Sequence, residues 1–207
     1  AKLLNLKEEG EKGSSVYHLE NLILIHLNIV KQAAIDAINS GYTKYTNIEG
    51  IPELRQSIVE KFKKDNDLNY DVSNVIVGTG GKQILFNALM SSLNKDDEVI
   101  IPAPYWVSYP DMTLLADGKP IFVDCSSETN FKLTGEALDK VITKNSKWLI
   151  LNSPSNPTGS CYSLSELEEI ANVVRKHENL YVMTDDIYEY IVYDNFKFYT
   201  LAQVALI

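Results

Sequence analysis

Short apolar runs alternate with segments of helical periodicity along most of the chain. The runs have the length and composition of buried strands. Between them, apolar residues recur every three or four positions, which predicts helices over 83–93, 107–116, 134–142 and 163–177. This alternation predicts an α/β fold, a mostly parallel sheet with helices on both faces. The predicted strands are residues 75–77, 98–102, 121–123, 147–151 and 180–184.

The amino-terminal part is predicted to be helical from residue 29 onwards. One helix runs from Ile29 until Gly41 ends it, and a second runs from Pro52 to about Lys64. Residues 22–25 are apolar but too few to distinguish a strand from a helix. Thr134 is the predicted N-cap of the helix that follows it. Ser163 or Ser165 is the predicted N-cap of the helix 163–177, since a glutamate lies three residues after each of these serines.

Charge and composition narrow the classes of function. The chain has 28 acidic and 19 basic residues, a net charge of −9, and no basic block. This argues against nucleic acid and anionic membranes as partners. No apolar run reaches the ~18 residues that span a membrane. Cys125 and Cys161 match neither a disulfide framework nor a metal site, and His18 and His26 lack partner ligands. We therefore expect a cytoplasmic protein without a metal.

Polar side chains follow two of the predicted strands. Residues 152–159 read Asn-Ser-Pro-Ser-Asn-Pro-Thr-Gly, directly after the strand 147–151, and Asp185 ends the strand 180–184. Open α/β sheets bind ligands at the carboxyl ends of their strands. We expect Asn156 and Asp185 to hold two polar atoms of one flat cofactor. Taken alone, Asp185 is better explained as a helix cap or a solvated carboxylate at the end of a strand.

A glycine loop and a tryptophan add to this candidate site. Residues 78–82, Gly-Thr-Gly-Gly-Lys, join a strand to a helix, an arrangement in which free amides and the helix dipole face a phosphate. The alternative is that these glycines only make a tight turn. Trp106 follows the strand 98–102 and either stacks on a flat ring or belongs to the core.

Six stretches in order resemble the class I aminotransferases, pyridoxal-phosphate enzymes of the aspartate aminotransferase fold, and most of all their bacterial subgroup. The resemblance extends from about Ile29 to Thr200. The stretches are Tyr-Thr-Lys-Tyr-Thr at 42–46, Gly-Ile-Pro-Glu-Leu-Arg at 50–55, Gly-Gly-Lys-Gln at 80–83, Pro-Tyr-Trp-Val-Ser-Tyr-Pro at 104–110, residues 152–159, and Asp-Asp-Ile-Tyr-Glu at 185–189.

The resemblance implies a pyridoxal 5′-phosphate site and a role for each matching residue. The backbone amides of Gly80, Gly81 and Lys82 would hold the cofactor phosphate, and Trp106 would stack on the pyridine ring. Asp185 would keep the ring nitrogen protonated. Two further residues, Asn156 and Tyr188, would bind the phenolic oxygen.

The resemblance also implies substrates and a partner. The substrates would be an amino acid and a 2-oxo acid. Because the active sites of the family form across a homodimer, Tyr45 would reach the phosphate of the partner subunit.

The chain departs from the family pattern at both ends. The catalytic Schiff-base lysine and the arginines that bind phosphate and substrate carboxylate have no counterpart, and Arg55 and Arg175 are interpreted as helix-surface charges. We therefore expect a partial large domain over 29–200, an atypical segment 1–28, an abrupt tail 201–207 and no carboxyl-terminal small domain. As a truncated aminotransferase, the chain is expected to be inactive and to have no catalytic residue of its own.

Three other interpretations are considered. The first is a non-catalytic remnant that binds cofactor weakly or pairs with a complementing fragment. The second is another enzyme of the same fold, such as a carbon–sulfur lyase. The third, a nucleotide-binding Rossmann domain, is disfavoured because Gln83 occupies the place of the third glycine.

A shifted reading frame is our hypothesis for the atypical segment. When residues 20–28 are back-translated with chosen codons and read from the third base, they give Glu-Pro-Asp-Phe-Asp-Thr-Pro-Glu-His, a stretch similar to the family pattern at this place. The codons of the gene test this directly, and codons that do not permit that frame would exclude it.

Overall fold

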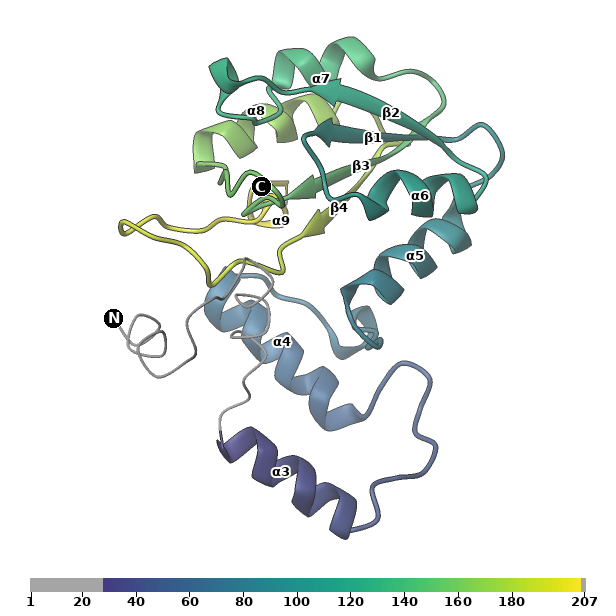
Figure 1. Cartoon of the computed structure of the whole chain (residues 1–207), viewed down its shortest axis with the longest axis vertical. Helices are drawn as coiled ribbons and strands as arrows, with labels where there is room; N and C mark the ends of the chain where they lie inside the picture. Colours follow the sequence, from purple (N-terminus) through teal and green to yellow (C-terminus); the bar gives the residue numbers. More distant parts are fainter. Residues whose placement is uncertain (1–27, 206–207) are drawn as a thin grey trace, which may run out of the picture. The chain divides into compact units, whose positions relative to one another are not determined.

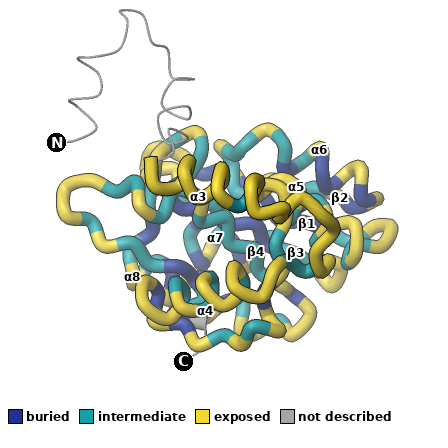
Figure 2. Tube along the Cα trace, turned by 90° about the horizontal axis from the view of Figure 1, so that it is seen from below, coloured by how far each residue is buried: buried dark blue, intermediate teal, exposed yellow. Residues whose placement is uncertain are grey.

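The computed structural model describes residues 28–205 of the chain, which divides into two compact units, 1–46 and 47–207. In the described part of the first unit, α3 (Asn28–Asn39) has no buried residue, and Ile29, Ile35 and Ile38 are exposed (Figure 2). Gly41 ends this segment as predicted, with a φ of 81°. The predicted segment 1–28, apart from Asn28, lies outside the described residues.

The second unit is built on one parallel sheet with the strand order β2-β1-β3-β4 (Figure 1). All three strand pairs are parallel, which confirms the predicted fold class. Because the strands are parallel, each crossover between them returns the chain to the end of the sheet where strands begin. The carboxyl ends of all four strands therefore lie along the opposite edge of the sheet. The strands are β1 (Glu98–Ala103), β2 (Lys119–Asp124), β3 (Ser146–Asn152) and β4 (Tyr181–Asp185).

Helices cover both faces of this sheet (Figure 1). Along β1, Val99 and Ile101 pack against the helices of one face and Ile100 packs on the other, since successive side chains of a strand point to opposite faces. The first face carries α5 (Gly81–Ser92) and α6 (Ser108–Leu115). The second carries α7 (Gly135–Val141), α8 (Leu164–Val174) and α9 (Leu201–Ala205). Because the strands carry apolar side chains on both faces, the sheet separates two hydrophobic cores, one under each layer of helices.

The predicted helix caps are confirmed. The Thr134 hydroxyl accepts a hydrogen bond from the amide of Ala137. Ser163 and Glu166 form a reciprocal capping box at the start of α8, in which each side chain accepts from the amide of the other residue. Pro52 begins α4 (Pro52–Asn66), as the sequence indicates. These local signals place the helices that flank the sheet.

The predicted strand at 75–77 is wrong. These residues follow a short 3-10 helix, η1 (Val72–Asn74), and Val75 has extended dihedral angles, but the segment joins no ladder in the described structure. Instead, the amide of Val77 donates to the carbonyl of Glu49 at 2.9 Å. Extended backbone becomes a strand only when a neighbouring strand pairs with it. A second 3-10 helix, η2 (Ser127–Thr129), follows β2.

Arg55 is a structural clamp, so its interpretation as a helix-surface charge is wrong. Its side chain is only 12% exposed, and its Nε donates to the carbonyl of Val75 at 3.0 Å. Its Nη2 donates to the carbonyl of Val72 at 2.6 Å. Arg175 is exposed but also has structural contacts, since its Nη2 donates to the carbonyl of Val204 in α9.

Residues 201–205, predicted as part of a tail, form α9. Leu201 and Val204 are buried in the core on the α7 and α8 face. Within residues 28–205, no helix has the length and apolar character needed to cross a membrane.

Candidate cofactor site

Asn152 connects the ends of β3 and β4. It is the register partner of Asp185, so the two residues lie side by side at the carboxyl edge of the sheet. Its Nδ2 donates to the backbone carbonyl of Asp185 at 2.7 Å, and its Oδ1 accepts from the amide of Asn156, also at 2.7 Å. One side-chain amide therefore fixes the loop that carries Asn156 against the strand that carries Asp185.

Tyr109 orients the Asp185 carboxylate. Its hydroxyl donates to Asp185 Oδ2 at 2.7 Å, and the residue is 2% exposed. Burial raises the pKa of Tyr109 well above its ordinary value, and the negative charge of Asp185 raises it further. The phenol therefore stays protonated and donates. Asp185 has a second oxygen for another donor.

Trp106 packs edge-on against Tyr109, with ring centroids 5.4 Å apart and planes at 85°. Its other neighbour is Lys82, whose Nζ lies 4.9 Å from the indole centroid. Trp106 thus links the carboxylate end of the site, through Tyr109, to the start of α5. The sequence left two alternatives for Trp106, a ring that stacks on a ligand or a core residue. In the structure its ring is partly buried, which is compatible with either.

The start of α5 is open to a ligand. Gly80 is the N-cap residue, with a φ of 85° that favours glycine, and Gly81 is the first helical residue. A Cβ atom at either glycine would meet nothing within 4 Å. The amide of Gly80 donates to the carbonyl of Gly78 at 3.0 Å. The first amides of a helix have no partner within it, so those of Gly81 and Lys82 are the donors that face an anion here. The arrangement fits a phosphate group.

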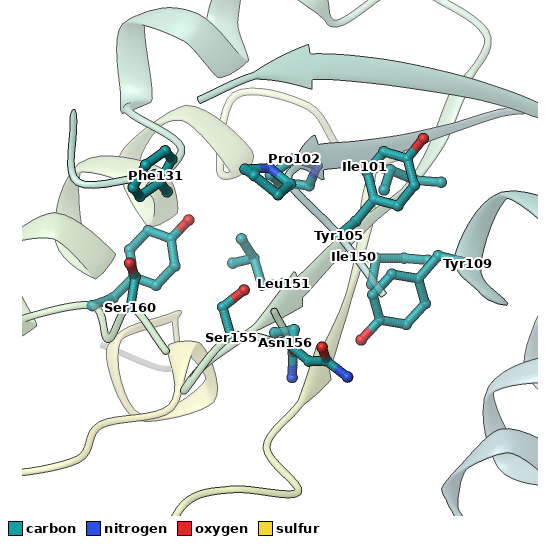
Figure 3. A pocket seen from close by; sticks show the side chains of 13 residues that line it. Ile101, Pro102, Tyr105, Tyr109, Phe131, Ile150, Leu151, Ser155, Asn156 and Ser160 are labelled. Carbon is teal, nitrogen blue, oxygen red and sulfur yellow. The ribbon is translucent and has the colours of Figure 1, made fainter. Parts of the chain in front are cut away.

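A small pocket lies between the carboxyl ends of β1 and β3 (Figure 3). Tyr105, Tyr109, Ser155 and Asn156 line it together with strand residues. Tyr105 also stacks on Phe122, with centroids 5.1 Å apart. Asn156 therefore lines a cavity beside Tyr109, as a ligand contact requires.

Tyr188 lies three residues after Asp185, in the segment that follows β4. Tyr45 belongs to the other unit and is fully exposed. In the described part of the chain, no group of three or more His, Cys, Asp or Glu side chains is placed to hold a metal ion.

Sequence reasoning assigned no role to two residues of the site, Tyr109 and Asn152. Both stood inside stretches already singled out by their likeness to a family. Tyr109 follows Trp106 by three residues, close to one helical turn, which is the one local signal that they share a face. The contact of Tyr109 with Asp185 spans 76 positions and has no local signature.

The family model that describes aminotransferase class I and II matches residues 13–206. The chain belongs to the class I and II aminotransferases. Aminotransferases of this family are generally dependent on pyridoxal phosphate.

Curated relatives agree with this family. A probable aspartate/prephenate aminotransferase of Rickettsia bellii is 63% identical over 176 residues, 85% of this chain and 44% of the relative. The aspartate/prephenate aminotransferase of Cereibacter sphaeroides is 55% identical over 175 residues, 84% of this chain and 44% of its own length. The chain therefore spans less than half the length of these aminotransferases.

Solved aminotransferase structures share the fold. The aspartate aminotransferase of Rhizobium meliloti superimposes with a TM-score of 0.85 at 48% identity, over 86% of this chain and 44% of the other. That of Thermus thermophilus with maleate gives a TM-score of 0.82 at 41% identity, over 85% of this chain and 46% of the other. The sheet and its helices thus have the aspartate aminotransferase fold, over less than half of the length of these neighbours.

Proposed function

We propose that this chain provides the cofactor-binding part of an aspartate/prephenate-type aminotransferase and binds pyridoxal 5′-phosphate. The substrates of the whole enzyme would be an amino acid and a 2-oxo acid. The observation that carries the proposal is the Asp185 carboxylate, which accepts a hydrogen bond from Tyr109, the residue whose ring packs against Trp106. When bound, the cofactor supplies an electron sink for the carbon that loses a proton.

Asp185 would hold the proton on the ring nitrogen of the cofactor. Its Oδ2 already accepts from Tyr109, which leaves Oδ1 for that nitrogen. A carboxylate paired with a protonated nitrogen makes a charge-assisted hydrogen bond, about twice as strong as a neutral one. The negative charge of Asp185 keeps the ring cationic, and the buried phenol of Tyr109 keeps the carboxylate from rotating.

The remaining residues would fix the position of the cofactor. The amides of Gly80, Gly81 and Lys82 would bind its phosphate at the open start of α5. Trp106 would lie against the ring. Asn156 would donate to the phenolic oxygen, and Asn152 would hold the loop of Asn156 in place.

Tyr188 and Tyr45 complete the proposed site. Tyr188, which follows Asp185 by three residues, would be a second donor to the phenolic oxygen. Tyr45 would bind the cofactor phosphate of the partner subunit in a homodimer. Its full exposure is compatible with a contact between subunits.

Transamination also needs a lysine that bonds to the cofactor, and we propose that the isolated chain lacks one. Lys82 has its amine over the Trp106 ring and its backbone at the proposed phosphate site. Lys197 lies over the ring of Tyr199, outside the proposed site. The isolated chain would then bind the cofactor without transferring amino groups.

A cofactor titration tests the proposal. Pyridoxal 5′-phosphate is added to the 207-residue chain, and binding is followed by quenching of tryptophan fluorescence and by induced circular dichroism of the cofactor. We expect saturable binding that weakens at least tenfold in Asp185→Asn, with no change in the control Asp194→Asn. Equal affinity in Asp185→Asn and the parent would contradict the role of Asp185.

Borohydride trapping followed by peptide mapping tests the lysine. We expect scattered labelling of surface lysines and no conversion of aspartate and 2-oxoglutarate. Stoichiometric labelling of one buried lysine, or a normal transamination rate, would contradict the proposal that the isolated chain lacks this lysine.

A further inference from the structure

The chain after β4 is attached to the carboxyl-terminal end of α4 through two successive residues, Glu189 and Tyr190. Lys61 Nζ lies 2.5 Å from Oε1 and 2.6 Å from Oε2 of Glu189. The hydroxyl of Tyr190 donates to Asp65 Oδ2, and Lys61 Nζ lies 5.5 Å from the centroid of the Tyr190 ring. The two hydrogen-bonded pairs are 128 and 125 positions apart in the sequence. They therefore hold one segment of the chain against a distant one.

The pair of Lys61 and Glu189 is largely withdrawn from water. The side chain of Glu189 is 15% exposed and that of Lys61 is 29% exposed. Asn66, a buried residue, joins both: its Oδ1 accepts from Lys61 Nζ at 2.7 Å, and its Nδ2 donates to Glu189 Oε2 at 3.3 Å. The three N–H donors of the lysine thus have three acceptors within reach. Such a charge-assisted group holds its geometry more firmly than an exposed ion pair does.

The segment between Asp185 and Glu189 is held at both ends. At its start, the carboxylate of Asp185 accepts from Tyr109, and the backbone carbonyl of Asp185 accepts from Asn152. At its end, Glu189 is bound to α4. Tyr188 is the last residue before the second of these anchors.

Two tight turns connect Tyr188 to this second anchor. The amide of Glu189 donates to the carbonyl of Asp186 at 2.9 Å, and the amide of Ile191 donates to the carbonyl of Tyr188 at 2.7 Å. Tyr188 is therefore a central residue of the first turn and the first residue of the second. Glu189 belongs to both turns, so a movement of Glu189 moves the backbone of Tyr188 with it.

We propose that Glu189 is a positioning residue for Tyr188: its pairing with Lys61 and Asn66 places the Tyr188 phenol to donate to the phenolic oxygen of the cofactor. The inference rests on the proposed function and deepens it, because it names the part of the chain that sets one donor of the site. A hydrogen bond weakens steeply as its length and angle depart from the optimum. Glu189 therefore acts on the cofactor through Tyr188, without contact of its own.

A thermodynamic cycle on cofactor affinity tests this coupling in the 207-residue chain. Glu189→Gln removes the negative charge that pairs with Lys61 and keeps the size of the side chain. We expect it to weaken binding of pyridoxal 5′-phosphate about fivefold, in the range of one hydrogen bond, but less than about twofold in the Tyr188→Phe background. Equal losses in the two backgrounds would overturn the inference.

The absorption spectrum of the bound cofactor gives a second readout, which a loss of stability alone would not move. A donor at the phenolic oxygen favours the ionised form of that oxygen, so its removal or displacement raises the pH at which the spectrum changes. We expect Tyr188→Phe and Glu189→Gln each to raise this pH, and the double variant to raise it no further than Tyr188→Phe. A shift in Tyr188→Phe with none in Glu189→Gln would show that Glu189 does not act on Tyr188.

Glu136→Gln is the matched control. Glu136 also pairs with a lysine, Lys140, at 2.6 Å, but the side chains are 80% and 68% exposed. The control should leave both the affinity and the spectrum unchanged, and losses equal to those of Glu189→Gln would contradict the inference.

Urea denaturation without cofactor shows whether each variant is folded. Should Glu189→Gln not fold, Lys61→Gln repeats the cycle from α4 with residue 189 intact, and the same dependence on Tyr188 is expected. A parent chain that does not bind the cofactor would contradict the proposed function and this inference with it. Binding by the parent with additive losses in the cycle would contradict this inference alone.

Discussion

The hydroxyl of Tyr109 donates to Asp185 Oδ2 across 2.7 Å, from a ring that is 2% exposed. Because burial and the neighbouring carboxylate raise the pKa of Tyr109, the proton stays on the phenol at neutral pH. The interaction therefore has a fixed direction. Asp185 is held by its side chain to α6 and by its backbone to Asn152.

Replacing Tyr109 by Phe removes this donor and keeps the ring that packs against Trp106. A hydrogen bond to a charged group contributes about 1.5 kcal/mol or more, which corresponds to roughly tenfold in affinity. We expect pyridoxal 5′-phosphate to bind about tenfold more weakly, measured by fluorescence titration. Tyr105→Phe is the matched control, because Tyr105 lines the same pocket and stacks on Phe122 through its ring. Equal losses in both variants would argue against a specific role for Tyr109.

Replacing Asn152 by Ala removes both hydrogen bonds that join the loop of Asn156 to the end of β4. Two lost hydrogen bonds and the polar groups left unpaired should lower the free energy of unfolding by about 2 kcal/mol. Urea denaturation measures this. Asn145→Ala is the control, since Asn145 is exposed, and it should change stability by less than about 0.5 kcal/mol. An Asn152→Ala variant as stable as the control would show that the loop is held by other contacts.

The stability of the chain should depend on pH through Asp186. Its pKa is raised from 3.8 to about 6 by burial, so the folded state binds a proton more tightly than the unfolded state. This contribution to stability is full below pH 4 and is lost as the pH rises through about 6. Asp186→Asn should therefore reduce the fall in the free energy of unfolding between pH 4 and pH 6. The comparison with Asp194→Asn isolates Asp186 from other groups, and identical pH profiles would refute the assignment.

Replacing Arg55 by Lys keeps the charge and removes the planar group that binds the carbonyls of Val75 and Val72. One or two lost hydrogen bonds from a partly buried group should cost about 2 kcal/mol. Chemical denaturation tests this against Lys64→Ala, an exposed position on the same helix. Similar stabilities of the two variants would restore the simpler view of Arg55 as a surface charge.

Local signals predicted most of the second unit. The Ser163 capping box and the apolar run of β3 need only their own neighbours in sequence, and both formed as expected. Residues 75–77 have the composition of a strand, but a strand also needs a pairing partner, which sequence periodicity does not supply. The sequence shows that Arg55 is charged, but it does not show which carbonyls the side chain binds, because these lie on a loop about 20 residues away. For the same reason, the sequence indicated Asp185 as a candidate and gave no sign of its contact with Tyr109, 76 positions away.

The all-parallel sheet has a consequence for how the chain folds. Glu98 pairs with Lys119 on one side and with Ser146 on the other, so no strand pair is closed by a tight hairpin. Each strand pair forms only after the crossover between its two strands has been ordered. The chain therefore loses much conformational entropy before strand pairing stabilises the fold. We therefore expect slow refolding compared with a helical protein of this size, with the central strands unprotected from association in the meantime.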